Sequence, residues 1–352
     1  MNNTAITYYI ELLKGLLELY HQEEESIKPE LIYRAKLIAR AAIIVSLFCK
    51  NKDKSIIDLV SGAMWLEQVV GGNCYIAELI INLTPQEKQR INFPLDELVI
   101  SEMGDTYEQM LSIDTVGFEV VAGKGLRNQL GSYYSPHELV SYLTQTSIEY
   151  YIQKNSVDSL EKAKIVDFSC GAGVFLISAL KLISKYLPNV SIDVLVPNLY
   201  ACDVDFIALE LAKLNILDLS NNLKNYQILS RHFYHANFLI HDGSSEPVTV
   251  EKIALSMKGY IYHPSLAVGS DFLTEYDIIL GNPPWEKIRF EEKKFYAQFS
   301  EQVLQTNFKF DLAKSIETSE KLNMELKSYV DDYRLNLELC KKRRSEERRV
   351  GK

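Results

Sequence analysis

The sequence has little of what marks secreted, membrane-spanning or metal-bound proteins. Its 352 residues include five cysteines, which form no CxxC pair and no zinc-like spacing, so neither a disulfide framework nor a structural metal is indicated. No positively charged leader precedes an apolar core, and the most apolar stretch, residues 37–49, carries Arg40 and is too short to span a bilayer. We therefore expect a globular, cytoplasmic protein without a membrane segment or a metal.

Basic residues are also scarce. Lys and Arg number 38 against 47 Asp and Glu, which gives a formal net charge of -9, whereas a protein that reads nucleic acid usually presents a basic face. Hydrophobic residues make up 47% of the chain, which is enough to bury a large core in two domains or more.

Tryptophan occurs only twice, and Trp285 closes the run Gly281, Asn282, Pro283, Pro284 after an apolar stretch that predicts a buried strand. Two prolines cannot continue a strand, so the chain turns into a rigid corner with free carbonyl groups. The Asn282 side-chain oxygen and the Pro283 carbonyl can both accept hydrogen bonds from one exocyclic amino group, while Trp285 offers a flat face. The corner suits a planar base that carries an amine, although an Asn-Pro-Pro turn with a buried Trp explains the same residues.

Residues 1–128 are predicted to form a helical accessory domain, and nothing in them indicates catalysis. The first helix has an apolar face made of Ile6, Tyr9, Ile10, Leu13, Leu16, Leu17 and Tyr20. The last helical segment, 103–111, precedes a glycine-containing connector at 117–125.

The segment after this connector predicts the start of a helix. Ser135, Pro136 and Glu138 read as a capping box, with Ser135 at the N-cap, Pro136 at the first helical position and Glu138 at the third. Capping does not explain Tyr133 and Tyr134, which indicate a loop that faces a ligand.

A strand, a glycine turn and a helix follow. The strand is predicted at 164–168, and Gly171 and Gly173 in the turn allow a ligand to approach the backbone near a helix N-terminus. A third glycine is missing, which disfavours NAD. Cys170 has no evident basic partner, so a small buried residue is the better interpretation than a thiol nucleophile.

Two further strands end in polar residues. Residues 198–202 lead to Asp203, whose carboxylate can accept both hydroxyls of a ribose, while Asp205 is more simply a helix N-cap. Residues 231–234 lead to Asn237 and Phe238, which can bind the edge and the face of an adenine. The alternation of strands and helices predicts a doubly wound, Rossmann-like, mostly parallel sheet with ligands at the carboxyl ends of its strands.

Together these segments resemble the gamma-group N6-adenine DNA methyltransferases, which use S-adenosylmethionine. The matching segments are Gly131 to Pro136 (motif X), Asp167 to Gly173 (motif I), Ala201 to Asp203 (motif II), Asn237 and Phe238 (motif III), and Asn282 to Trp285 (motif IV). The sequence departs from the family pattern at Phe168, where Pro is common, at Asn237, where Asp is common, and at Trp285, where Tyr is common. Of these departures, Asn237 puts a cofactor contact in question.

The resemblance implies a role for each motif. Motif X would close over the methionine end of the cofactor, and Asp167 would hold the methionine amino group. The turn residues Ser169, Cys170, Gly171 and Gly173 would border the cofactor, Asp203 would bind its ribose, and Asn237 with Phe238 its adenine. The corner Asn282, Pro283, Pro284 and Trp285 would hold the target adenine, flipped out of double-stranded DNA.

Other functions remain open at this point. Protein-glutamine N5-methyltransferases also use an Asn-Pro-Pro corner, and N4-cytosine DNA methyltransferases are closer still, although Ser is more usual there in place of Asn282. A degenerate module that only binds cofactor or DNA is a non-enzymatic alternative.

The expected domains are the helical domain 1–128, a methyltransferase core 129–285, and a charged helical segment 286–343 that begins a larger C-terminal part. Residues 344–352 resemble a translated sequencing adapter. We therefore expect this chain to be an interrupted, inactive piece of a longer protein, whose remaining part carries the basic DNA-reading surface. The resemblance also implies a restriction-modification or phage-defence setting, with a fused or separate endonuclease as a possible partner.

Overall fold

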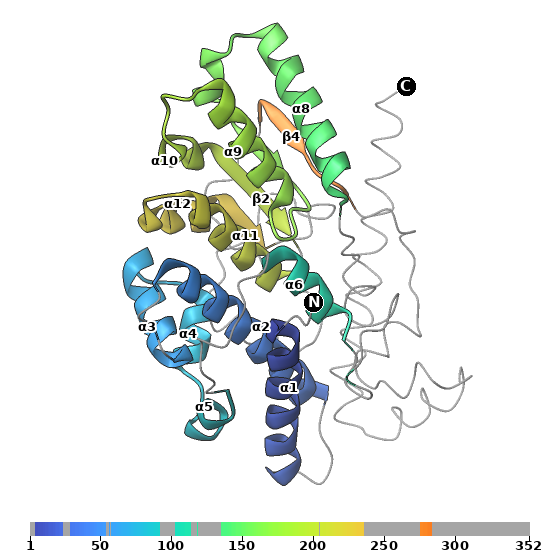
Figure 1. Ribbon diagram of the computed structural model, residues 1–352, viewed down its shortest axis with the longest axis vertical. Coiled ribbons are helices and arrows are strands. Elements are labelled where there is room, and N and C mark those ends of the chain that lie inside the picture. Colours follow the sequence, from blue (N-terminus) through green and yellow to red (C-terminus); the bar gives the residue numbers. More distant parts are fainter. Residues whose placement is uncertain are drawn as a thin grey trace, which may run out of the picture.

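The computed structural model describes residues 4–23, 29–53, 56, 58–91, 103–113, 118, 135–203, 205–235 and 275–283. A helical part comes first in the chain and a parallel sheet with its own helices follows (Figure 1). Within the described ranges, no helix is both long and apolar enough to cross a membrane.

The helical part contains α1 (Thr4–Glu23), α2 (Pro29–Lys52), α3 (Leu59–Val70), α4 (Tyr75–Ile81), α5 (Pro85–Ile91) and α6 (Met103–Leu111). The predicted apolar face of α1 is buried except at Ile10, which is partly exposed. The apolar stretch predicted to be too short for a membrane lies in α2 and is buried as well. Apolar periodicity thus sets the packing of this part.

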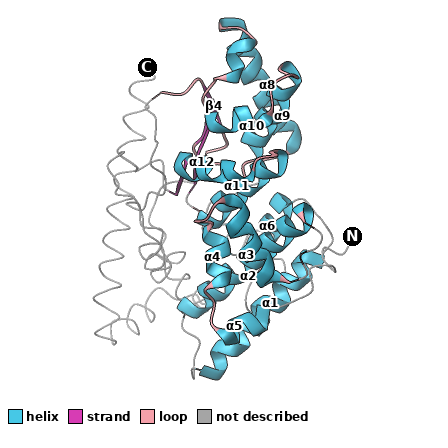
Figure 2. Ribbon diagram, turned by 90° about the vertical axis from the view of Figure 1, so that its left-hand side faces the viewer, coloured by secondary structure: helices cyan, strands magenta, loops and turns pink. Residues whose placement is uncertain are grey.

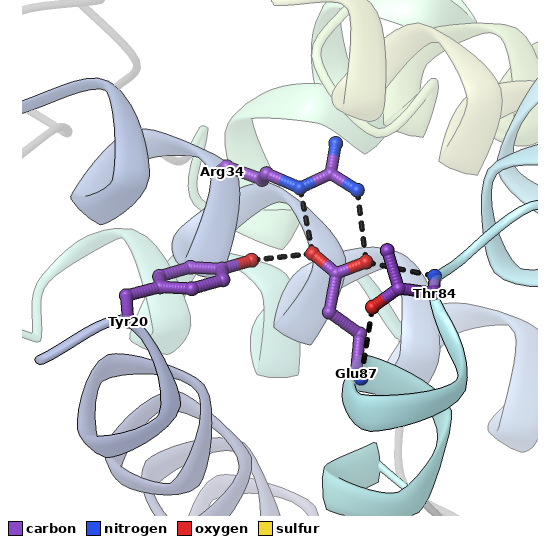
Figure 3. Close-up of polar contacts among 4 residues, drawn as sticks. All are labelled: Tyr20, Arg34, Thr84 and Glu87. Atoms are coloured by element: carbon purple, nitrogen blue, oxygen red, sulfur yellow. Dashed lines mark hydrogen bonds and ion pairs between the residues drawn. The ribbon is translucent and has the colours of Figure 1, made fainter. Parts of the chain in front are cut away.

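Glu87 ties three of these helices together (Figure 3). Its carboxylate accepts hydrogen bonds from the Tyr20 hydroxyl at 2.6 Å and from Arg34 Nε at 2.7 Å. Thr84 and Glu87 also form a reciprocal capping box, with the Thr84 N–H donating to Glu87 Oε2 and the Glu87 N–H donating to Thr84 Oγ1. Burial acts to raise the pKa of Glu87, but the hydrogen bonds from Arg34 and Tyr20 lower it to about 2.

The sheet has four parallel strands in the order β3-β2-β1-β4. They are β1 (Ile165–Asp167), β2 (Leu199–Asp203), β3 (Phe233–His235) and β4 (Ile278–Leu280). The predicted α/β class with a parallel sheet after a helical region is confirmed. Each strand overlaps its predicted segment, and Asp203 is the last residue of β2 instead of the first residue after it.

The sheet is accompanied by α8 (His137–Lys154), α9 (Val174–Tyr186), α10 (Ile192–Leu195), α11 (Phe206–Leu219) and α12 (Tyr226–His232), with short 3-10 turns at Asp158–Glu161, Val196–Asn198 and Leu223–Asn225. Helix α11 is buried on nearly all sides because it packs against β2 and β3 as well as against α2, α4 and α6. It therefore lies between the sheet and the helical part (Figures 1 and 2). The buried side chains form one continuous core from α1 to β4.

Candidate active site

Three of the predicted motif segments meet at one edge of the sheet. Strand β1 lies between β2 and β4, and its last residue, Asp167, is in register with Ala201 and with Leu280. The carboxyl ends of parallel strands share an edge, so Asp167, Asp203 and the corner that follows Leu280 come together. Segments more than a hundred residues apart in sequence thus form one site.

Asp167 is a fully buried carboxylate. Its Oδ1 accepts a hydrogen bond from the Ser169 N–H at 2.9 Å, while Oδ2 has no hydrogen-bond partner in the part of the chain that the structure describes. Burial, with a smaller contribution from the nearby Asp203, raises the pKa of Asp167 to about 7, against the lowering effect of the Ser169 hydrogen bonds. A buried oxygen without a partner is uncommon, and a carboxyl group in this position requires either a proton or a positively charged neighbour.

The two turn glycines have different surroundings. Gly171 has φ +49 and its would-be Cβ meets nothing within 4 Å, so this side of the backbone is open. Gly173, at φ +84, begins α9, and a Cβ there would lie 3.0 Å from Cβ of Ala212 on α11. The open side of Gly171 leaves room next to the backbone, and Gly173 packs closely against Ala212 of α11.

Cys170 is buried, and burial raises the pKa of its thiol well above the usual value. Its backbone N–H donates to the Cys202 carbonyl at 3.1 Å, which joins the turn after β1 to β2. A buried, protonated thiol is a poor nucleophile, so the interpretation of Cys170 as a small buried residue is confirmed.

Asp203 connects two loops at the end of β2. Its Oδ2 accepts from the Gly171 N–H at 2.7 Å, and its Oδ1 accepts from the Asp205 N–H at 2.8 Å. Asp205 in turn caps α11 through the Ile207 N–H, as predicted. Asp203 therefore links the turn after β1 to the start of α11.

Asn282 joins the corner after β4 to two other segments. Its side-chain Nδ2 donates to Ser135 Oγ at 3.2 Å, and its backbone carbonyl accepts from Ser169 Oγ at 3.1 Å. Gly281 just before it lies against Asp167. The motif X, motif I and motif IV segments are therefore in direct contact.

The predicted capping box at the start of α8 is wrong, although the helix itself is confirmed. Pro136, at φ -52 and ψ 138, is the N-cap, and it makes no side-chain capping bond. The extended backbone of Pro136 delays the helix by one residue, so Glu138 occupies its second position instead of its third. Ser135 is buried and its hydroxyl binds Asn282 instead of the helix end.

Comparison with known proteins agrees with this geometry. A sequence model of the family described as N-6 DNA Methylase matches residues 99–324. The chain belongs to this family. The match includes α6 and every strand of the sheet.

Two individual proteins are similar to this member of the methylase family. A protein of Methanocaldococcus jannaschii, described as a type II restriction enzyme and methyltransferase, is 29% identical over an alignment that covers 34% of this chain and 14% of that protein. A chain in the cryoEM structure of a DrdV-DNA complex aligns with a TM-score of 0.44 and 14% identity, covering 83% of this chain and 30% of that one. The chain thus spans less than a third of the length of either protein.

Six of the predicted site residues lie outside the described residues: Tyr133, Tyr134, Asn237, Phe238, Pro284 and Trp285. Sequence reasoning overlooked Asn215, whose Nδ2 donates to the Ala172 carbonyl at 3.0 Å, and Tyr107, which binds Asp205 from α6. A tyrosine on an apolar helix face gives no signal of such a contact. Tyr107 does, however, lie inside the matched residues 99–324, near their start.

Proposed function

We propose that the whole protein is a site-specific DNA adenine N6-methyltransferase that uses S-adenosylmethionine and acts in a restriction-modification or phage-defence system. Membership of the N-6 DNA Methylase family supports the reaction. The similarity to a protein described as a restriction enzyme and methyltransferase supports the setting. We further propose residues 129–285 as the catalytic core and residues 1–128 as its accessory part.

The observation that carries this proposal is the direct contact between the Asp167 and Asn282 segments. Ser169 Oγ donates to the Asn282 carbonyl at 3.1 Å, and Gly281 leaves just enough room for the Asp167 carboxylate. In the proposed site Asp167 faces the cofactor and Asn282 faces the target base. Their mutual packing fixes the distance between the two reactants, which is the main requirement of a direct group transfer.

The residues present fit S-adenosylmethionine. The unpartnered Oδ2 of Asp167 suits the methionine ammonium group, because a buried carboxylate requires a positive partner or a proton. The open side of Gly171 allows close approach to the backbone, and Asp203 offers two oxygens to the ribose hydroxyls. We assign the adenine to Asn237 and Phe238, and the closure over the methionine end to Tyr133, Tyr134, Ser135 and Pro136.

When bound, S-adenosylmethionine supplies a methyl group on a positively charged sulfur. Ser135 holds the Nδ2 side of the Asn282 amide, which directs Oδ1 away from Ser135. In the proposed mechanism this Oδ1 and the Pro283 carbonyl each accept a hydrogen bond from one N–H of the adenine amino group. Such hydrogen bonds pull the nitrogen toward sp3 geometry and aim its lone pair, so positioning and local electrostatics replace a charged base.

The target adenine leaves the duplex at a cost of a few kcal/mol. Stacking on Trp285 offsets about 1–3 kcal/mol of that cost. Pro284 keeps the corner between Asn282 and Trp285 rigid, since its ring fixes the backbone angle.

Two measurements test the proposal. Calorimetry on the 352-residue chain should show binding of S-adenosylmethionine. DNA treated with the whole protein should release N6-methyladenine on digestion to nucleosides, as measured by mass spectrometry. Release of N4-methylcytosine instead would establish the rival reaction, and methylation of protein glutamine without any DNA product would refute the DNA substrate.

A further inference from the structure

Helix α6 contacts both loops of the proposed cofactor site, although it belongs to the helical part of the chain. A Cβ built on Gly104 would lie 3.6 Å from Cβ of Ala172 in the turn after β1. One turn later, the Tyr107 hydroxyl donates a hydrogen bond to Asp205 Oδ2, just after the end of β2. Figure 1 shows α6 between the helices of the first part and α11.

A buried chain of polar groups runs from α2 through Tyr107 to Asp203. Arg40 Nη1 donates to the Tyr107 hydroxyl at 2.9 Å and lies 3.6 Å from Asp205 Oδ2. The Asp205 N–H then donates to Asp203 Oδ1. Arg40, Tyr107 and Asp205 are each at least 94% buried, so solvent does not weaken these contacts.

Tyr107 keeps its proton in this chain of polar groups. Burial raises the pKa of Tyr107 well above its usual value, with Arg40 acting in the opposite direction, so the hydroxyl keeps its proton and donates. The buried Arg40 guanidinium needs an anion nearby, and Asp205 supplies it. The carboxylate of Asp205 is therefore held from two sides, by Tyr107 and by the α11 N-terminus through the Ile207 N–H.

We propose that Arg40 and Tyr107 are positioning residues for the cofactor-binding site, acting through Asp205 on Asp203. The proposal rests on the assignment of Asp203 to the cofactor ribose. Asp205 presents its N–H to Asp203 Oδ1 only while its own side chain is fixed. Loss of the Tyr107 hydroxyl removes the hydrogen bond to Oδ2 and leaves that side chain held by Arg40 and the Ile207 N–H alone, so the Asp203 carboxylate is less firmly oriented while its charge is unchanged.

The experiment measures cofactor binding by calorimetry on the 352-residue chain and its Tyr107→Phe variant. The variant keeps the aromatic ring and removes the hydroxyl, with its hydrogen bonds from Arg40 and to Asp205, so we expect S-adenosylmethionine affinity to fall roughly fivefold to tenfold. S-adenosylhomocysteine should lose affinity by the same factor, because both molecules contain the ribose. In an Asp203→Asn background, Tyr107→Phe should not reduce cofactor affinity further, because Tyr107 acts on the cofactor only through Asp203.

Tyr20→Phe is the matched control. Tyr20 also donates to a carboxylate that is paired with an arginine, but Glu87 and Arg34 lie in the helical part and outside the proposed site. Both tyrosine variants should lower the thermal midpoint, while Tyr20→Phe changes cofactor affinity less than twofold, within the precision of the measurement. Should Tyr107→Phe not fold, Arg40→Lys keeps the buried charge and serves as the second variant with the same expectations.

Three results would overturn the inference. The folded Tyr107→Phe variant could bind S-adenosylmethionine with unchanged affinity, or Tyr20→Phe could lose as much affinity as Tyr107→Phe. Alternatively, Tyr107→Phe could reduce the affinity of the Asp203→Asn protein by the same factor as that of the wild type. A wild-type chain that binds no S-adenosylmethionine would instead refute the proposed function, and the inference with it. Cofactor binding by the wild-type chain thus distinguishes failure of the proposed function from failure of the positioning role alone.

Discussion

Gly281 leaves no room for a side chain because the carboxylate of Asp167 fills that space. A Cβ built on Gly281 would lie 2.6 Å from Asp167 Oδ1 and 3.2 Å from its Cγ. The backbone there also has φ +149, a conformation that side chains disfavour. The residue just before the proposed catalytic Asn282 thus fixes how closely β4 approaches the proposed cofactor acid.

Replacing Gly281 with alanine should displace Asp167 and damage cofactor binding. Overpacking of this kind typically costs about 1–3 kcal/mol of folding free energy. We expect Gly281→Ala to lower the thermal midpoint and to weaken S-adenosylmethionine binding in calorimetry. Gly15→Ala is the control, because a Cβ there meets only the Arg90 side chain and backbone at 3.8 Å or more within a helix, where alanine stabilises by up to about 1 kcal/mol. Normal binding by Gly281→Ala would contradict the close fit.

Cofactor affinity should depend on pH through Asp167. Its pKa of about 7 in the free protein, raised by burial with help from Asp203, means that the carboxyl group is protonated below neutrality. An ammonium ligand requires the ionised form, so binding releases a proton below about pH 7. We expect affinity to fall roughly tenfold per pH unit there, and Asp167→Asn should bind weakly without this dependence.

The raised pKa of Asp167 also makes folding stability depend on pH, but in the opposite direction to cofactor affinity. The folded pKa of Asp167 lies above its ordinary value of 3.8, so its contribution to stability is fully present below pH 3.8 and is lost as the pH rises through about 7. Asp167→Asn should therefore gain in stability over the wild type across that window in thermal unfolding. A constant difference between the two proteins from pH 4 to 8 would show that Asp167 titrates normally.

Asn282→Ala should abolish methyl transfer by the whole protein and leave cofactor binding nearly intact. Loss of one well-placed group at a reacting centre typically costs about 10²–10³ in rate. Ser135→Ala keeps Asn282 but removes the hydroxyl that accepts from its Nδ2, so we expect a smaller loss, of about tenfold. Single-turnover transfer of labelled methyl groups to DNA measures both, and equal rates for Asn282→Ala and wild type would refute the mechanism.

The helical part should lose stability in acid through Glu87. Hydrogen bonds from Arg34 and Tyr20 outweigh the effect of burial and hold its pKa at about 2, below the usual 4.5. The ionised Glu87 therefore stabilises the folded state by on the order of 2–3 kcal/mol. This stabilisation is present above pH 4.5 and is lost as the pH falls through 2. The difference in thermal midpoint between wild type and Glu87→Gln should therefore shrink as the pH falls from 5 to 2.5. The idea fails if that difference stays constant.

Most helices and strands, and the polar residues at their ends, were predictable from the sequence. The apolar face of α9, the cap of α11 by Asp205 and the acids at the ends of β1 and β2 all follow from residues within a few positions of one another. Periodicity and capping are local, because helices and strands repeat over two to four residues. The parallel sheet follows from the alternation of these elements.

Which polar groups contact one another was not predictable from the sequence and follows from the packing of distant segments. Ser135 read as a helix cap, but its hydroxyl pairs with Asn282, which lies 147 residues away. The close packing of Gly173 against Ala212 on α11 could not be predicted from the glycine turn alone. Arg40, inside an apolar run, gave no hint of Tyr107 and Asp205. Such pairings depend on which side chains remain buried without partners once the helices and strands have packed, and no local pattern encodes that outcome.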